Sequence, residues 1–291
     1  MGRGLYVHQA ATILMISIQH ALARIREEHR PVRFLASRAL WHSGLSRWLT
    51  IDRGRYRLRF FPTALSAQYW LHPAADRVEE QFFAAYLRPG DTVVDVGANI
   101  GALTLLAASL VGPAGRVVAF EAHPRIFRYL EANLRMNGAS AVQARNVAAG
   151  DQAETIRFSD HRADDQNAVS ERGGVAVPCE RLDSALAGVG EVQLLKVDTE
   201  GFEKFVFAGA GKVLSRTRCV YFESWEEHCA RYGYTSPELV AALRGAGFEV
   251  FRLEGRALLP ILEGHRSDAC EDLVATRDPS DLAARTGFDI R

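Results

Sequence analysis

Residues 91–105 read DTVVDVGANIGALTL, a run in which a short apolar strand passes directly into a helix. The strand is expected over residues 92–96, and the chain then turns through Gly97, Asn99 and Gly101. Glycine has no Cβ, so it permits a tight turn and lets the backbone approach a ligand closely. The stretch therefore predicts a strand–turn–helix unit of an α/β sheet, with a ligand site at the turn.

Strands and helices alternate in the same way along the rest of the chain. Apolar runs of strand length occur at residues 92–96, 116–120, 141–147, 192–197, 219–222, 248–252 and 273–276. Helical periodicity is found at residues 100–109, 124–136, 203–214 and 237–246. Such alternation predicts an α/β fold whose mostly parallel, seven-stranded sheet is covered by helices on both faces.

Four regions are expected along the chain. They are an N-terminal helical appendage (1–50), a short β element with a linking helix (51–82), the main domain (83–277) and a C-terminal tail (278–291). In the appendage, Leu14, Ile18, Leu22 and Ile25 mark one stripe of an amphipathic helix. Residues 155–177 predict a short strand followed by a mobile surface loop.

Charge is distributed unevenly over a chain whose formal net charge is zero. Residues 1–60 contain eleven arginines and three acidic residues, so the appendage is basic. The overall balance gives no field that favours nucleic acid or a membrane surface as a partner. Polar residues interrupt the apolar stretch 5–23, which argues against a transmembrane segment. We expect a cytoplasmic protein that binds no nucleic acid, with the appendage serving as a lid or as the contact of a homodimer.

Glu121 makes the ligand site more specific. It lies twenty residues after Gly101, at the carboxyl end of the next expected strand. An acidic side chain at this place can accept hydrogen bonds from both ribose hydroxyls of an adenosine-containing ligand. The first turn has the pattern D-x-G-x-N-x-G, which differs from the glycine pattern that cradles a pyrophosphate. A nucleoside ligand without phosphates is therefore favoured.

A second group of acidic residues is expected at the same edge of the sheet. The stretch LLKVDTEGFE, residues 194–203, places Asp198 at the end of a strand and Glu200 in the following turn. Glu223 ends the next strand. Carboxylates brought together need a balancing cation, which a positively charged ligand, a divalent metal or Lys196 could supply.

These motifs together resemble the FkbM family of methyltransferases. The resemblance covers residues 56–276 and rests on YLRPGDTVVDVGANIG, FEAHP, RLDSAL, LLKVDTEGFE followed by Gly209-Ala210, and YFES. It implies a class I, Rossmann-like methyltransferase sheet whose last strand is antiparallel. It also implies S-adenosylmethionine as methyl donor and a hydroxyl of a sugar, polyketide or other secondary metabolite as acceptor.

The resemblance also assigns roles to residues. The first turn would hold the methionine part of the cofactor, Glu121 the ribose, and residues 146–148 the adenine. The predicted cofactor contacts are Asp95, Gly97, Ala98, Asn99, Gly101, Glu121, Ala122, Asn146, Val147, Ala148 and Asp198.

Methylation of an alcohol requires a general base and a bound acceptor held close to the methyl group. The candidate bases are Asp198, Glu200, Glu223 and His228, all expected at or just beyond the carboxyl edge. Asp198 and Glu223 end consecutive strands, as the metal-binding acids of catechol O-methyltransferase do, so Mg²⁺ assistance is an alternative. No dedicated metal ligands are assigned.

Other functions stay open at this point. Glu121 would serve the ribose of NAD equally well, so an NAD-dependent oxidoreductase is the nearest enzyme alternative. A module that binds an adenosine ligand without catalysis is another, and N-methylation is a further variant because one fold carries many acceptors.

Overall fold

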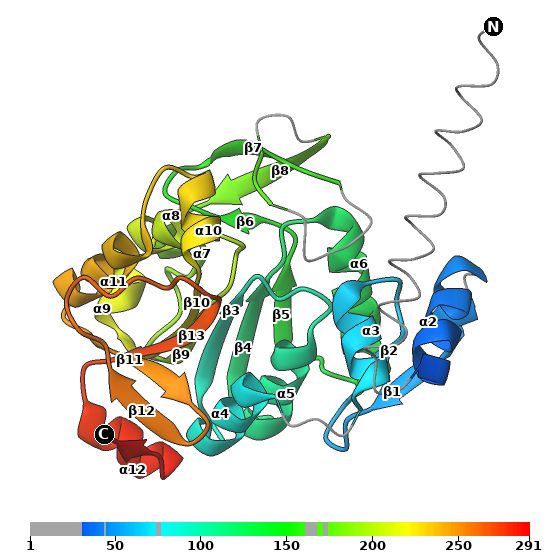
Figure 1. Ribbon diagram of the computed structural model, residues 1–291, viewed down its shortest axis with the longest axis horizontal. Coiled ribbons are helices and arrows are strands. Elements are labelled where there is room, and N and C mark those ends of the chain that lie inside the picture. Colours follow the sequence, from blue (N-terminus) through cyan, green and yellow to red (C-terminus); the bar gives the residue numbers. More distant parts are fainter. Residues whose placement is uncertain (1–30, 44, 74–76, 161–167, 171–173) are drawn as a thin grey trace, which may run out of the picture.

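A computed structural model describes residues 31–43, 45–73, 77–160, 168–170 and 174–291. Its centre is a nine-stranded sheet in the order β14-β12-β11-β13-β10-β9-β3-β4-β5 (Figure 1). The strands are β3 Thr92–Val96, β4 Arg116–Phe120, β5 Val142–Arg145, β9 Val192–Val197, β10 Thr217–Ser224, β11 Glu249–Glu254, β12 Ala257–Pro260, β13 Glu271–Thr276 and β14 Asp289–Ile290.

The predicted α/β class is confirmed, with one correction to the number of strands. All seven predicted strands lie in the sheet, and β13 is antiparallel to both of its neighbours, β10 and β11. The sheet has nine strands rather than seven because β12 pairs with the outer edge of β11, and β14 then pairs with β12. Both added strands are short, so they leave little apolar pattern in the sequence.

Helices cover both faces of the sheet because alternate strand residues are apolar on both sides. In β3, Val93 belongs to one buried cluster and Val94 to the other. The first cluster includes residues of α4 Val78–Tyr86, α5 Ala102–Val111, α6 Pro124–Met136 and α12 Pro279–Thr286. The second includes residues of α7 Leu182–Ala185, α8 Glu203–Ala208, α9 Gly211–Ser215, α10 Glu226–Arg231 and α11 Ser236–Gly245.

The helix predicted over residues 203–214 is divided into α8 and α9. The break falls at Gly209, which packs against the backbone of a distant loop. A Cβ at this position would lie 1.9 Å from the carbonyl oxygen of Gly150. This close approach explains why the sequence has glycine here.

The described part of the N-terminal region packs on the main domain. It contains α2 Pro31–Ser43, the 3₁₀ helix η1 Leu45–Trp48, β1 Thr50–Asp52, β2 Arg57–Arg59 and α3 Ala64–Leu71. The amide of Arg59 donates to Asn133 Oδ1 of α6 over 2.8 Å, and Tyr56 donates to Glu80 Oε1 of α4 over 2.7 Å. The predicted stripe from Leu14 to Ile25 lies outside the described residues. No described helix combines the length and apolarity needed to cross a membrane.

A second, three-stranded sheet lies beside the carboxyl end of the main sheet (Figure 1). It consists of β6 Ala148–Ala149, β7 Glu154–Phe158 and β8 Val175–Glu180, in the order β6-β8-β7. The short strand expected after residue 154 is present as β7. Much of the predicted mobile loop, residues 161–167 and 171–173, lies outside the described residues, but Val169 forms a β-bridge with Phe158.

The predicted C-terminal tail is a folded part of the domain, which corrects that expectation. Residues 279–290 form α12 and β14, and Leu282 and Phe288 are buried. Phe288 contacts Phe82 of α4 edge-on, with ring centroids 6.3 Å apart. The segment looked like a tail because its two elements are short and only one side of each is apolar.

Replacing Phe288 by alanine tests this correction. Phe288→Ala should lower the free energy of unfolding by about 3–5 kcal/mol, the usual effect of removing a buried aromatic ring. Ile290→Ala is the control, because Ile290 is 41% exposed and its removal should have little effect. Urea denaturation measures both. Equal stability of the two variants would show that the C-terminal segment is a tail after all.

Candidate active site

The turn after β3 is held directly against the end of β9. Gly97, Asn99 and Gly101 have φ angles of 79°, 51° and 88°, in the left-handed region that favours glycine and asparagine. A Cβ on Gly97 would lie 1.8 Å from the carbonyl oxygen of Asp198. Only glycine allows this approach, so the turn and the carboxyl end of β9 form one continuous surface.

The amides of this turn are used inside the protein. Gly97 and Ala98 both donate to the carbonyl of Phe120, over 3.0 and 2.9 Å, and Gly101 donates to the carbonyl of Ala98. Side chains accept the two remaining amides: Asn99 N donates to Glu121 Oε2, and Ile100 N donates to Asn99 Oδ1. The five amides from residue 97 to 101 therefore all have partners before any ligand binds.

Glu121 is buried at the carboxyl end of β4. Its Oε2 accepts the amide of Asn99 over 2.9 Å, and its Oε1 accepts the amide of His123 over 2.8 Å. Burial raises the pKa of Glu121 to about 7, although these hydrogen bonds and the charge of Lys196 oppose that shift. Each carboxylate oxygen can accept a further hydrogen bond, so Glu121 can still bind two hydroxyl groups of a ligand.

A groove runs from Glu121 along the ends of β4 and β6, and we call it the Glu121 groove. Besides Glu121, six of the predicted cofactor contacts line it: Gly97, Asn99, Ala122, Val147, Ala148 and Asp198. Residues that the sequence analysis missed also line it: His123, Ile126, Phe158, Val169 and Phe202. The groove therefore has apolar walls beside the buried carboxylate of Glu121, which suits an aromatic base joined to a sugar.

Asn146 holds the loop after β4. Its Nδ2 donates to the carbonyls of Glu121 and Ala122, each over 2.9 Å. It is not among the residues that line the groove. The contact of Asn146 with adenine stays a prediction.

A second cavity lies on the other side of the first turn, and we call it the Glu79 cavity. It shares Gly97, Asn99, Asp198 and Glu200 with the Glu121 groove, so the two spaces adjoin. The predicted residues Asp95, Ala98 and Glu223 line it as well. Its outer wall comes from α3 and α4, which the sequence analysis did not connect to the site. That wall contributes Gln68, Tyr69, Arg77 and Glu79.

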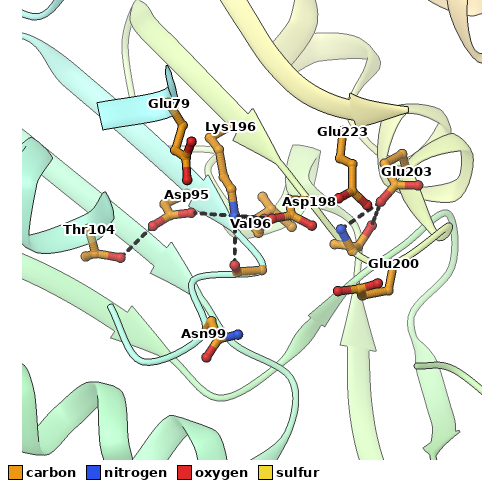
Figure 2. A network of polar contacts seen from close by, with 12 residues as sticks. Glu79, Asp95, Val96, Asn99, Thr104, Lys196, Asp198, Glu200, Glu203 and Glu223 are labelled. Atoms are coloured by element: carbon orange, nitrogen blue, oxygen red, sulfur yellow. Dashed lines mark hydrogen bonds and ion pairs between the residues drawn. The ribbon is translucent and has the colours of Figure 1, made fainter. Parts of the chain in front are cut away.

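Lys196 is part of β9, and its side chain lies between Asp95 of β3 and Asp198 at the end of β9 (Figure 2). Its Nζ is 3.4 Å from Asp95 Oδ1, 3.4 Å from Asp198 Oδ2 and 2.8 Å from the carbonyl oxygen of Gly97. Burial alone would lower the pKa of Lys196, but the charges of Asp198 and Asp95 outweigh that effect and raise it. Lys196 is thus a buried cation that pairs with two of the acids at this edge.

The remaining predicted candidates form a separate cluster. His228 Nδ1, on α10, lies 3.4 Å from Glu200 Oε2 and 3.4 Å from Glu223 Oε2. Asp198 is paired with Lys196 instead, so the alternative of an Mg²⁺ ion between Asp198 and Glu223 gains no support. Of the described residues, the group able to offer ligand atoms to a metal is Glu200, Glu223 and His228.

Glu203 was not predicted, although it fixes the position of Glu200. Its Oε1 accepts the amides of Thr199 and Gly201 over 2.7 and 3.2 Å. Glu200 lies in the middle of this turn with a φ of 56°, which is rare for a residue other than glycine, asparagine or aspartate. Burial raises the pKa of Glu203 to about 7.

Comparison with known proteins identifies the family. A model of the methyltransferase FkbM domain matches residues 95–250, which is more than half of the chain. The chain belongs to the FkbM methyltransferase family. Among curated FkbM proteins, 31-O-demethyl-FK506 methyltransferase FkbM from Streptomyces tacrolimicus is 31% identical over 202 residues, covering 56% of this chain and 75% of that relative.

Two further similarities are weaker. A protein-L-isoaspartate O-methyltransferase from Aeropyrum pernix is 42% identical over 64 residues. The match covers only 22% of this FkbM chain and 24% of that relative. A crystal structure of methyltransferase FkbM from Methylobacillus flagellatus KT has a TM-score of 0.44 at 15% identity, covering 72% of this chain and 52% of that chain.

The observed site fits the cofactor that the FkbM family implies. S-adenosylmethionine has an adenosine without phosphates, next to a positively charged sulfur and an amino acid. The Glu121 groove offers an acid for the ribose and apolar walls for the base. Gly97 lies directly against the end of β9, and the Glu79 cavity adds carboxylates that suit a positive charge.

The pKa of Glu121 predicts how binding depends on pH. A carboxylate accepts hydroxyl hydrogen bonds better than a carboxylic acid, and at a pKa of about 7 the ionised fraction rises about tenfold from pH 6 to pH 8. The affinity for 5′-methylthioadenosine, which lacks the amino-acid part of the cofactor, should rise by a similar factor. Calorimetric titration at several pH values measures it.

The matched variant is Glu121→Gln, which cannot ionise. It should bind 5′-methylthioadenosine more weakly than the native protein at pH 8 and show little change with pH. An affinity that does not depend on pH in the native protein, or a variant that binds as well at pH 8, would contradict the role given to Glu121.

Proposed function

We propose that this chain is an S-adenosylmethionine-dependent methyltransferase that methylates a hydroxyl oxygen of a small molecule. The acceptor class is a sugar, a polyketide or another secondary metabolite. Membership of the FkbM family supports methyl transfer. The choice of oxygen rests on the carboxylates beside the groove and on the curated relative, whose name describes a methyltransferase acting on 31-O-demethyl-FK506.

One observation carries the choice of cofactor: the amides of the first turn already have partners inside the protein. In dinucleotide-binding folds this turn and the start of the helix hold the pyrophosphate. Here Asp198, Glu200 and Glu223 lie nearby and would repel two negative phosphates. Both features favour a cationic, phosphate-free nucleoside and argue against an NAD-dependent oxidoreductase.

The residues of the site have separate tasks in this reaction. When bound, S-adenosylmethionine supplies a methyl group on a positively charged sulfur. Glu121 and the apolar walls would hold the nucleoside. The adjoining Glu79 cavity would hold the acceptor, and methyl transfer requires its oxygen close to the methyl carbon. The products are a methyl ether and S-adenosylhomocysteine.

Glu200 is the best-placed general base of the four candidates. It lines both the Glu121 groove and the Glu79 cavity, so it lies where the cofactor and the acceptor would meet. His228 lines neither space and is buried. Asp198 is held by Lys196. In this proposal Glu200 takes the proton that the hydroxyl loses, and His228 positions Glu200 and Glu223.

Three expectations, about location, acceptor class and oligomeric state, stay predictions. They are the cytoplasmic location, an acceptor that is not a nucleic acid, and a homodimer formed through residues 1–50.

Methyl transfer itself tests the proposal. The protein should transfer labelled methyl from S-adenosylmethionine to the oxygen of a compound in a panel of hydroxylated sugars and polyketides. Glu200→Gln should lower kcat by about 10²- to 10⁴-fold, the usual effect of losing a general base, with unchanged affinity for S-adenosylhomocysteine. Mass spectrometry of the product locates the label.

The matched control is Glu227→Gln, because Glu227 is an exposed glutamate on α10, next to His228 in sequence. It should retain full activity. Label found on nitrogen would contradict the hydroxyl acceptor, and a Glu200→Gln variant as active as Glu227→Gln would contradict the assignment of the base.

A further inference from the structure

His228 has a buried ring nitrogen that the methyl-transfer proposal leaves without a bonding partner. The His228 side chain is 8% exposed, and its Nδ1 makes no hydrogen bond in the structure. Buried polar atoms are nearly always hydrogen-bonded, and leaving one without a partner costs free energy. An unsatisfied nitrogen aimed between two carboxylates therefore calls for an explanation.

The distances around this nitrogen differ from those of hydrogen bonds. Nδ1 is 3.4 Å from Glu200 Oε2 and equally far from Glu223 Oε2, whereas N–H···O bonds are usually about 2.7–3.2 Å long. Two atoms bound to one metal at about 2.1 Å lie roughly 3.0–3.4 Å apart for angles between 90° and 109°. Both nitrogen–oxygen distances around Nδ1 fall at the upper end of this range.

Each of the three donors is held in place by its own neighbours. The His228 ring contacts the Trp225 ring, with centroids 4.3 Å apart. The other carboxylate oxygen of Glu223, Oε1, accepts from Cys270 Sγ over 3.0 Å. Glu200 lies in the turn fixed by Glu203. The donor atoms all lie within 4.8 Å of one another, so little rearrangement would be needed to bind an ion.

Charge also favours an ion at this point. The carboxylates of Glu200 and Glu223 both lie 3.4 Å from His228 Nδ1, whereas Lys196 pairs with Asp95 and Asp198. A protonated His228 would balance one negative charge, whereas a divalent cation with neutral His228 would balance both. Glu200 and Glu223 line the Glu79 cavity, so the ion would have an open side toward that cavity.

We propose that Glu200, Glu223 and His228 form a binding site for a divalent transition-metal ion. A set of one imidazole and two carboxylates suits ions from Mn²⁺ to Zn²⁺ better than Mg²⁺, which prefers oxygen ligands and retains its water. This site differs from the Asp198–Glu223 pair considered from the sequence, because it excludes Asp198 and includes a nitrogen ligand.

The function of the ion rests on the proposed methyl transfer, although its binding does not. An ion with an open position beside the Glu79 cavity would bind the acceptor hydroxyl and lower the pKa of that hydroxyl. The hydroxyl proton would then leave more easily, to Glu200 or to water.

Metal binding is measured directly on the full chain after treatment with a chelator. Co²⁺ should bind at one ion per chain and give visible absorption bands, and Zn²⁺ should compete for the same site. Mg²⁺ should bind at least about tenfold more weakly than either ion. His228→Gln and Glu200→Gln should each weaken Co²⁺ binding by about 100-fold or more.

Two control variants keep this test specific. His265 forms an ordinary 2.7 Å contact with Glu271, so His265→Gln should bind Co²⁺ as the native protein does. Asp198→Asn should also retain binding, because Asp198 is paired with Lys196. Affinity for S-adenosylhomocysteine should survive in His228→Gln, which separates this inference from the proposed function and shows that the variant is folded.

Two results would overturn the inference. One is the absence of stoichiometric Co²⁺ or Zn²⁺ binding to the native protein. The other is Co²⁺ affinity that is unchanged in both His228→Gln and Glu200→Gln. Dependence on Asp198 but not on His228 would instead favour the oxygen-only pair of Asp198 and Glu223.

Discussion

The site depends on one buried ammonium group. Lys196 lies between Asp95 and Asp198 and donates to the carbonyl of Gly97, so it joins β3, β9 and the turn between β3 and α5 (Figure 2). Two acids at adjacent strand ends would repel each other without it. Because the ammonium charge offsets part of this repulsion, the backbone of Gly97 can lie directly against the end of β9. The floor of the Glu121 groove and of the Glu79 cavity is therefore one rigid surface.

The carboxyl edge of the sheet has two parts with different electrostatics. On one side, Lys196 pairs with Asp95 and Asp198, and Glu121 uses its two oxygens to order the loops that shape the groove. On the other side, Glu200 and Glu223 both lie 3.4 Å from His228 Nδ1. The first part suits recognition of a nucleoside. The second brings together carboxylates that can receive a cation or a proton.

The sequence predicts the features that depend on residues close together in the chain. Buried strands appear as apolar runs, and the strand-end acids Asp95, Glu121 and Asp198 follow from the rule that parallel strands end at one edge. The walls of the Glu79 cavity could not be predicted, because they depend on tertiary packing: α4 packs on α5, and β2, which precedes α3, packs on α6 through the contact of Arg59 with Asn133. The hydrogen bonds of Asn146 with the carbonyls of Glu121 and Ala122 could not be predicted either, because an amide can contact a ligand or a nearby carbonyl and only the fold decides which.

The central claim is that the charge of Lys196 organises this edge, and the variant Lys196→Met tests it most directly. Loss of the ammonium leaves Asp95, whose side chain is 1% exposed, as a buried negative charge without a positive charge beside it. The free energy of unfolding should fall by about 3–5 kcal/mol, with weaker binding of S-adenosylhomocysteine. Adding Asp95→Asn should recover most of the stability, because the amide oxygen can still accept from Thr104. A Lys196→Met protein with native stability and native affinity would contradict the account.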